Sequence, residues 1–170
     1  LFGLHLYGCE FRAVCVEHER KLKVFDHHYL RTILPVKYTE FVLNDTVRAR
    51  CDNITRITQA IQERRLRWFG HVLRRPPQEL SITALDPSPL PRWSRRRGGQ
   101  LKTWLDTVRQ EMEVVLGPSA FSLRRWRREW VELSRSAAAD RHAWRGTVRD
   151  IIEAGKIRHD RSRTKYQAGS

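Results

Sequence analysis

The sequence predicts an all-α protein: a small bundle of about five to six helices with a mobile loop rich in proline and arginine and a disordered basic tail. Apolar residues recur at the three- and four-residue spacing of amphipathic helices over most of the chain, whereas the alternating pattern of a half-buried strand is almost absent. Hydrophobic residues make up 40% of the 170 residues, enough for a core and too many for a wholly disordered chain.

The first predicted helix spans residues 17–34 and ends before Pro35, which cannot continue it. Its apolar face carries about one residue per turn: Leu22, Phe25, Tyr29 and Ile33. We expect Asn44 to N-cap a short helix through about Arg50. Residues 1–16 have no predicted fold. Because the chain lacks an initial methionine, we expect a fragment or a chain truncated at its start.

A long basic helix follows, predicted to begin after a cap at Asp52 or Asn53 and to end at Pro76-Pro77. One side of it is apolar, with Ile57, Ile61, Trp68 and Val72 in a narrow arc and Leu66, Phe69 and Leu73 beside them. The other side is a basic ridge formed by Arg56, Arg64, Arg67, His71 and Arg74. This helix can therefore pack on one side and hold phosphates on the other, although a merely solvated basic face is the alternative.

Residues 78–99 form a predicted mobile loop, because prolines and a Gly-Gly pair interrupt every helical pattern there. An amphipathic helix follows over residues 101–116, and Gly117-Pro118 ends it. Its apolar residues fill about one third of the helical circumference. They are Leu101, Trp104, Leu105, Val108, Met112, Val115 and Leu116.

Two further helices complete the predicted bundle. One covers residues 122–134, with Leu123, Trp126, Trp130 and Leu133 aligned on one face. Asp140 caps the other, which carries Trp144, Val148, Ile151 and Ile152. The polar, basic residues 155–170 are predicted to be a disordered tail. Two helical subdomains, residues 17–77 and 100–154, thus flank the loop.

The formal charge of +14 indicates a polyanionic partner. Residues 56–102 hold eleven Lys or Arg against three acidic residues, and residues 156–165 add five against one. Arginine predominates, and its planar fork suits bidentate contacts with phosphate. Within the loop, Trp93 precedes a run of three arginines, where an exposed indole could stack on an unpaired base. Equally, Trp93 could pack the loop onto the bundle.

Five short motifs occur in a fixed order along the chain. They are Leu6-Tyr7-Gly8-Cys9-Glu10; Val24-Phe25-Asp26-His27-His28 with Leu30-Arg31-Thr32-Ile33-Leu34; Arg64-Arg65-Leu66-Arg67-Trp68-Phe69-Gly70-His71-Val72; Arg97-Gly98-Gly99-Gln100 with Lys102-Thr103-Trp104-Leu105; and Asp140-Arg141-His142-Ala143-Trp144-Arg145. With them the chain resembles the carboxy-terminal region, downstream of the polymerase palm, of reverse transcriptases from non-LTR (LINE-type) retrotransposons. The resemblance implies that the parent protein is an RNA-directed DNA polymerase.

The chain also departs from that family. Phe11-Arg12 stand where the family usually has Thr-Trp, Tyr29 stands where cysteine is common, and Gly98-Gly99-Gln100 often reads Gly-Arg-Pro. Polymerases of the family need a metal-binding aspartate pair, but the eight aspartates of this chain are scattered singly. The family's polymerase activity therefore does not carry over, and we expect no enzyme activity.

Other chemistries find little support in the sequence. The odd number of cysteines favours free thiols and a reducing compartment. A zinc site is an alternative reading of His5, Cys9, Cys15 and His18, but their spacing matches no strong pattern. The chain has neither a nucleophile elbow nor a phosphate-binding loop. We predict no catalytic residue, metal, cofactor, small-molecule substrate or membrane span.

The sequence thus predicts a nucleic-acid-binding carboxy-terminal region of a reverse transcriptase that holds RNA or an RNA–DNA hybrid by its backbone. The predicted contact residues are Arg56, Arg64, Arg67, His71, Arg74, Trp93, Arg95, Arg96, Arg97 and Lys102. One alternative is a structural module that packs on the missing polymerase domain of the parent protein. Another is a translated, degenerate remnant without activity. An intracellular location, cytoplasmic or nuclear, is expected.

Overall fold

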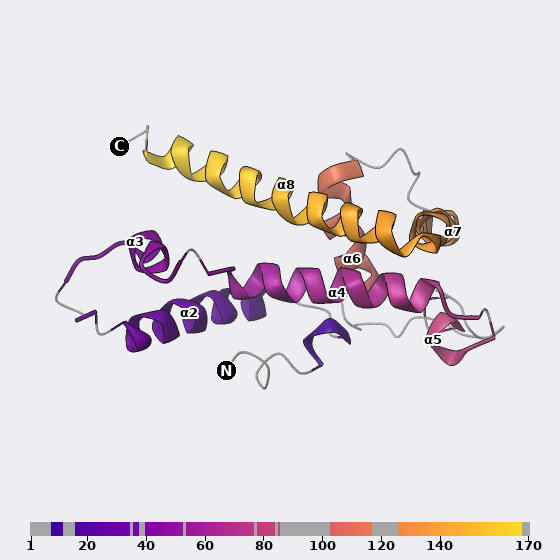
Figure 1. The fold of residues 1–170 in the computed structure, drawn as a ribbon, viewed down its shortest axis with the longest axis horizontal. Helices are drawn as coiled ribbons and strands as arrows, with labels where there is room; N and C mark the ends of the chain where they lie inside the picture. The colour runs from indigo at the N-terminus through magenta and orange to yellow at the C-terminus, as the bar shows by residue number, and fades with distance from the viewer. Residues whose placement is uncertain are drawn as a thin grey trace.

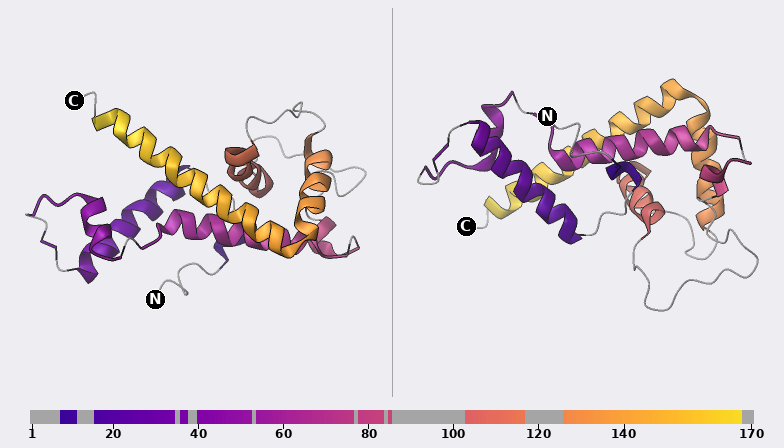
Figure 2. Two further views of the ribbon diagram at one scale, coloured as in Figure 1. Left: turned by 45° about the horizontal axis from the view of Figure 1, so that its top comes forward. Right: turned by 90° about the horizontal axis from the view of Figure 1, so that it is seen from below.

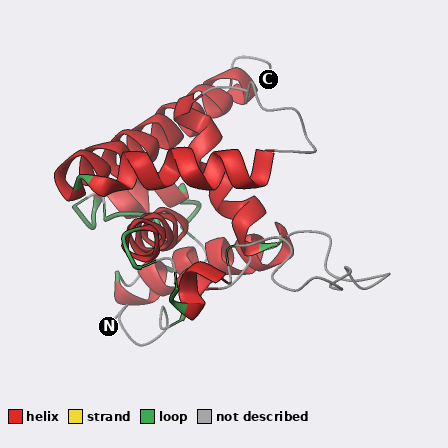
Figure 3. Ribbon diagram, turned by 90° about the vertical axis from the view of Figure 1, so that its right-hand side faces the viewer, coloured by secondary structure: helices red, strands yellow, loops and turns green. Residues whose placement is uncertain are grey.

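The computed structural model describes residues 8–11, 16–34, 36–37, 40–52, 54–76, 78–83, 85, 103–116 and 126–167. These residues form seven α-helices and one 3-10 turn, with no strand among them (Figures 1 and 3), so the predicted all-α class is confirmed. The elements are η1 (Cys9–Phe11), α2 (Val16–Ile33), α3 (Asn44–Ala49), α4 (Ile57–Leu73), α5 (Leu80–Thr83), α6 (Trp104–Leu116), α7 (Trp126–Ala139) and α8 (Arg141–Gln167).

Helix α4 is the centre of the structure. It contacts α2 and η1 along its first half, and α5, α6, α7 and α8 along the rest. Helix α8 crosses α4 obliquely, and the two are closest near the α7 end and diverge toward the carboxy end of α8 (Figures 1 and 2). Helix α3 contacts α2 at the far end of the molecule.

The main core lies where α4, α6, α7 and α8 meet. Its buried members are Leu66, Phe69, Val72, Leu73, Leu85, Val108, Met112, Val131, Ala138, Trp144, Val148 and Ile151. Trp144 is 2% exposed and donates its indole N–H to the carbonyl oxygen of Leu66 at 3.0 Å. Such a pairing removes the cost of burying the indole nitrogen, so that the large apolar ring can stabilise the helix crossing.

A second, smaller cluster joins α2 and η1 to the first half of α4. Ile57 and Ile61 are buried against Leu22, Phe25 and other partly buried groups. Trp104 of α6 donates its indole N–H to the carbonyl oxygen of Glu10 at 2.5 Å, which ties η1 to the main core. The two clusters share α4, so α4 links the first predicted helical segment to the second.

Two predicted N-caps are wrong, and at α4 a residue distant in sequence takes the place of the cap. The N-cap residues of α3 and α4 are Leu43 and Arg56, and neither makes a side-chain cap hydrogen bond. Asn44 instead accepts from the guanidinium of Arg31 at 2.9 and 3.2 Å. Asp26 of α2, rather than Asp52 or Asn53, accepts from the first backbone N–H of α4, although at 3.5 Å; Asn53 lies outside the described residues.

Two predicted apolar faces are confirmed only in part; on α2, Leu22 and Phe25 pack against the second cluster as predicted. On α2, Asp26 and Leu30 are buried, whereas Ile33 is 57% exposed, because α2 extends beyond the helix that covers it. On α7, Leu133 is 54% exposed, and the small or short side chains Val131, Ser134 and Ala138 face the core. Small residues permit close packing against α8, which the hydrophobic pattern does not reveal. The side chains of Trp126 and Trp130 lie outside the described part.

The predicted loop and tail are also corrected. Helix α5 lies inside the segment 78–99 that was predicted as loop, while residues 86–99 are outside the described part. Helix α8 continues to Gln167, so residues 155–167 are helical rather than disordered. The predicted cap of this helix is confirmed, since the Asp140 carboxylate accepts from the backbone N–H of His142 at 2.7 Å. Helix α6 begins with a capping box that the sequence analysis missed, formed by Thr103 and Asp106.

Candidate nucleic-acid interface

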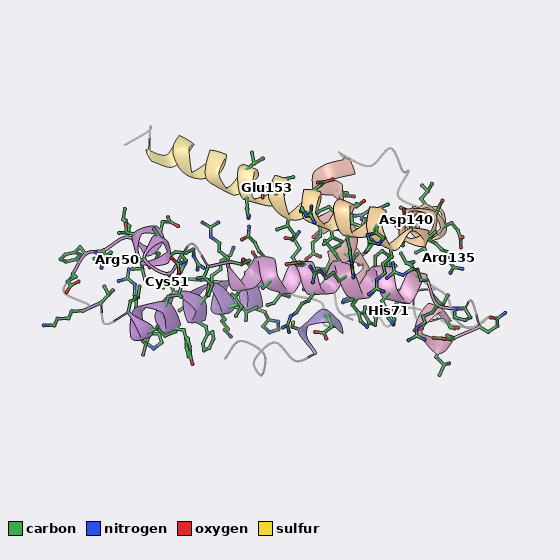
Figure 4. All side chains as sticks on the ribbon, in the orientation of Figure 1. Arg50, Cys51, His71, Arg135, Asp140 and Glu153 are labelled. Atoms are coloured by element: carbon green, nitrogen blue, oxygen red, sulfur yellow. The ribbon has the colours of Figure 1, made fainter. Side chains whose placement is uncertain are left out.

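A groove of about 870 Å³ runs along the seam between α4 and α8, and we call it the α4–α8 groove. Figure 4 labels two of its lining residues, His71 on α4 and Glu153 on α8, and also Asp140, which directly precedes α8. Basic side chains on its walls are Arg67, His71, Arg74, Arg141, Arg145, Arg149 and Lys156. The acidic lining residues are Glu63 and Glu153. The groove is therefore strongly basic.

The α8 wall carries Arg141, Arg145 and Arg149, all exposed. Residues four apart lie on one face of a helix, so the three guanidinium groups form a row with a rise of about 6 Å between neighbours. The buried Trp144 and Val148 alternate with this row and face α4. Core packing on one face of α8 thus fixes the direction in which the arginines of the adjacent face project.

The α4 wall contributes Arg67, His71 and Arg74 from the predicted basic ridge. Arg74 donates to the carbonyl oxygen of Ala138, at the end of α7, at 3.0 Å. Burial, followed by the positive charges of Arg141 and Arg145, lowers the pKa of Arg74 below its ordinary value. Arg141 and Arg145 are thus close enough to Arg74 for their positive charges to disfavour its charged form.

Most other basic residues of the bundle have a carboxylate partner. The pairs are Lys21–Glu17, Lys23–Glu19, Arg48–Asp26, Arg56–Asp45, Arg65–Glu111, Arg67–Glu63, Arg75–Glu79, Arg109–Glu113 and Lys156–Glu153. Within the described part of the chain, Arg74, Arg141, Arg145 and Arg149 form no such ion pair, and we call them the groove arginines. Six other described cations also lack an ion pair, but they are spread over several elements, whereas the four groove arginines lie together at the α7 end of the groove. The six are Arg20, Arg31, Lys37, Arg50, Arg64 and Arg135.

The predicted contact residues divide into three groups. Arg67, His71 and Arg74 line the groove, as described above. Arg56 and Arg64 do not: Arg56 pairs with Asp45 at 3.4 Å beside another cavity, and Arg64 is exposed toward η1, where its charge acts on Cys9. The rest lie outside the described residues, namely Trp93, Arg95, Arg96, Arg97 and Lys102.

The sequence analysis did not single out Arg141, Arg145 and Arg149, which line the groove. Their four-residue spacing, on the face next to the apolar series of Trp144, Val148 and Ile151, was a signal available in the sequence. What the sequence could not show is that α8 lies across α4, which brings two separate basic faces to one groove.

A second cavity, of about 480 Å³, lies between α2, α4 and α6. Its lining includes Asp26, which forms a buried ion pair with Arg48 at 2.5 Å, and Arg65, which is buried against Glu111. Each Lys or Arg that lines this cavity has an acidic partner, so the cavity carries little net positive charge that could attract a polyanion.

Catalytic and metal chemistry gain no support from the described residues. They contain no cluster of three or more His, Cys, Asp or Glu that could hold a metal ion, although His5 and Cys15 of the zinc alternative lie outside them. Burial, together with the hydrogen bond to Glu10, raises the pKa of the Cys9 thiol, which disfavours the reactive thiolate. None of the described helices has the length and apolar character needed to cross a lipid bilayer.

Comparison of the chain with protein-family models, with curated proteins and with solved structures finds no match, so the groove must be interpreted from its own geometry.

Proposed function

We propose that this chain is a nucleic-acid-binding helical module that holds RNA or an RNA–DNA hybrid by its backbone. The observation that carries the proposal is the convergence of four arginines without carboxylate partners on the α4–α8 groove. The ordered sequence motifs suggest the context, which is the region downstream of the palm in a non-LTR retrotransposon reverse transcriptase. In that context the module would position template or product, and the polymerase chemistry would belong to another part of the parent protein.

The binding mechanism follows from the residue types. Each guanidinium can donate two parallel hydrogen bonds to a phosphate, and each phosphate neutralised releases condensed counterions. With the four groove arginines engaged, the logarithm of the association constant should fall with the logarithm of salt concentration at a slope of about −3 for a single strand. Contacts of this kind fix position without reading bases, so little sequence preference is expected. Such a partner implies an intracellular location, cytoplasmic or nuclear.

The proposal is tested by fluorescence anisotropy of the full chain with a labelled single-stranded RNA at several salt concentrations, with polyglutamate as an acidic competitor. Binding that depends steeply on salt and resists polyglutamate would support it. Equal competition by polyglutamate at matched charge would show only generic attraction between a basic protein and any polyanion, and the proposal would fail.

One observation favours a second candidate, an interaction module. Val24, Phe41 and Leu43 are 64%, 101% and 65% exposed in the region of α2 and α3, which is unusual for large apolar side chains. Such residues suit contact with another protein surface, and the polymerase domain of the parent protein is the candidate. Sedimentation velocity over a range of concentrations tests for an adhesive surface: association that Phe41→Ser abolishes would favour this function, and a monomer at all concentrations would weigh against it.

A further inference from the structure

We infer that the α4–α8 groove takes one strand of a polynucleotide rather than a duplex, with phosphates between the two walls and bases toward solvent. This inference rests on the proposed function and narrows it to a substrate class. It depends on the size of the groove, the arrangement of the walls and the nature of the floor.

The groove is too narrow for a duplex to enter. From residue 141 to residue 156, α8 rises by about 22 Å. A volume of about 870 Å³, or about 1790 Å³ with the open space at its mouth, spread over that length gives a mean cross-section of about 40 to 80 Å². A duplex, whose major groove alone is about 12 Å wide, could touch only the rim, whereas a sugar–phosphate strand can lie inside.

The walls favour the same conclusion. Arg141, Arg145 and Arg149 follow the straight axis of α8, and Arg74 faces the first two of them from α4. A strand within a duplex winds away from a straight row, while a flexible single strand can follow it and meet cations on both sides. Toward the other end, Glu63 and Glu153 pair with Arg67 and Lys156, so the phosphates are held mainly at the α7 end.

The buried part of the floor offers no contact to a base edge. Trp144 and Val148 are each 2% exposed, and the indole N–H of Trp144 is already bonded to Leu66. These two floor residues therefore present neither a stacking surface nor a free hydrogen-bonding group; the other uncharged lining residues are Thr55 and the partly buried Ile152. Bases that pointed inward would lose hydration with little compensation from the floor, while the cations of the walls attract phosphates, so the backbone faces in and the bases face out.

The test compares a labelled mixed-sequence RNA of about 12 nucleotides, within the usual range of single-strand sites, with the same RNA paired to complementary DNA or RNA. Three full-length proteins are measured at one salt concentration. They are the wild type, the groove variant Arg141→Gln/Arg145→Gln/Arg149→Gln, and a control variant Arg20→Gln/Lys37→Gln/Arg50→Gln. The control removes the same charge from exposed positions away from the groove. Circular dichroism verifies that all three are folded.

We expect the wild type and the control variant to bind the single strand at least about tenfold more tightly than either duplex, and the groove variant to lose this preference. Equal or tighter duplex binding that the groove variant weakens would overturn the single-strand inference and leave the proposed function standing. A preference that survives in the groove variant would also overturn it, because the strand would then be held elsewhere. If the groove variant binds every probe as well as the wild type does, the proposed function itself fails.

Discussion

At the scale of single residues, Gly70 decides how closely α8 approaches α4. A Cβ built on Gly70 would overlap the indole of Trp144, so the helix crossing requires glycine at this position. We predict that Gly70→Ala lowers the free energy of unfolding by about 1–3 kcal/mol through overpacking. Urea denaturation followed by circular dichroism measures it.

The sign of this effect is diagnostic, because helix propensity alone would make Gly70→Ala stabilising. Gly146→Ala is the matched control, since Gly146 lies in α8 and a Cβ there meets nothing within 4 Å. The control should raise the free energy of unfolding by about 0.5–1 kcal/mol. If both substitutions stabilise the protein, α8 does not pack on α4 as described.

Single arginines also differ in their predicted contribution to RNA binding. Arg145 lines the groove beside Arg74, whereas Arg64 is exposed on another side of α4, toward η1. We predict that Arg145→Gln weakens RNA binding several-fold and reduces the magnitude of the salt slope by about 0.7, the value of one phosphate contact on a single strand. Arg64→Gln should change the RNA affinity and the salt slope much less. A larger effect at Arg64 in an anisotropy titration would favour the basic ridge predicted from the sequence over the groove.

At the scale of helices, a buried ion pair joins α2, α3 and α4. Asp26 and Arg48 have side chains 4% and 8% exposed, and Arg48 also donates to the carbonyl oxygen of Ile54 at 2.8 Å. We predict that Asp26→Ala lowers the free energy of unfolding by about 3–5 kcal/mol, because it leaves the guanidinium buried without a counter-charge.

The double variant Asp26→Leu/Arg48→Met removes both charges and keeps apolar bulk. It should recover most of the lost stability in the same urea titration, since replacing a buried pair by apolar residues is often neutral. A cost below about 1 kcal/mol for Asp26→Ala alone would mean that Arg48 reaches solvent in the native protein.

Sequence analysis succeeded for helices whose determinants are local. The cap at Asp140 and the apolar series from Trp144 to Ile151 lie within α8 itself, and both are confirmed. It failed where the determinants are tertiary. The carboxylate at the start of α4 belongs to Asp26, some thirty positions earlier, and no local pattern reveals it.

The candidate site shows the same limit. The basic face of α4 could be predicted from the sequence, and so could a basic series on α8 had its four-residue spacing been followed. The crossing of α4 and α8 at Gly70 and Trp144 determines which faces of the two helices lie together. This contact joins residues that are far apart in the chain. Which arginines have an ion-pair partner can also be known only from the folded structure, because partners such as Glu111 for Arg65 come from other helices.

At the scale of the whole molecule, the formal charge of +14 is unevenly compensated. Ion pairs neutralise some of the cations on α2, α3, α4 and α6. The described cations without an acidic partner are scattered elsewhere in the bundle, but four of them gather at the α7 end of the α4–α8 groove. A uniform excess would attract any polyanion weakly. A row of guanidinium groups in a groove is instead suited to a chain of regularly spaced phosphates.

The most direct test of this account is the salt dependence of RNA binding by the wild type, the groove variant and the control variant. The account predicts that the groove variant reduces the magnitude of the slope by about 2, the value of three phosphate contacts on a single strand. The control variant, which removes the same net charge, should keep nearly the wild-type slope. Equal reductions in the two variants would contradict the account, because binding would then follow total charge and not the α4–α8 groove.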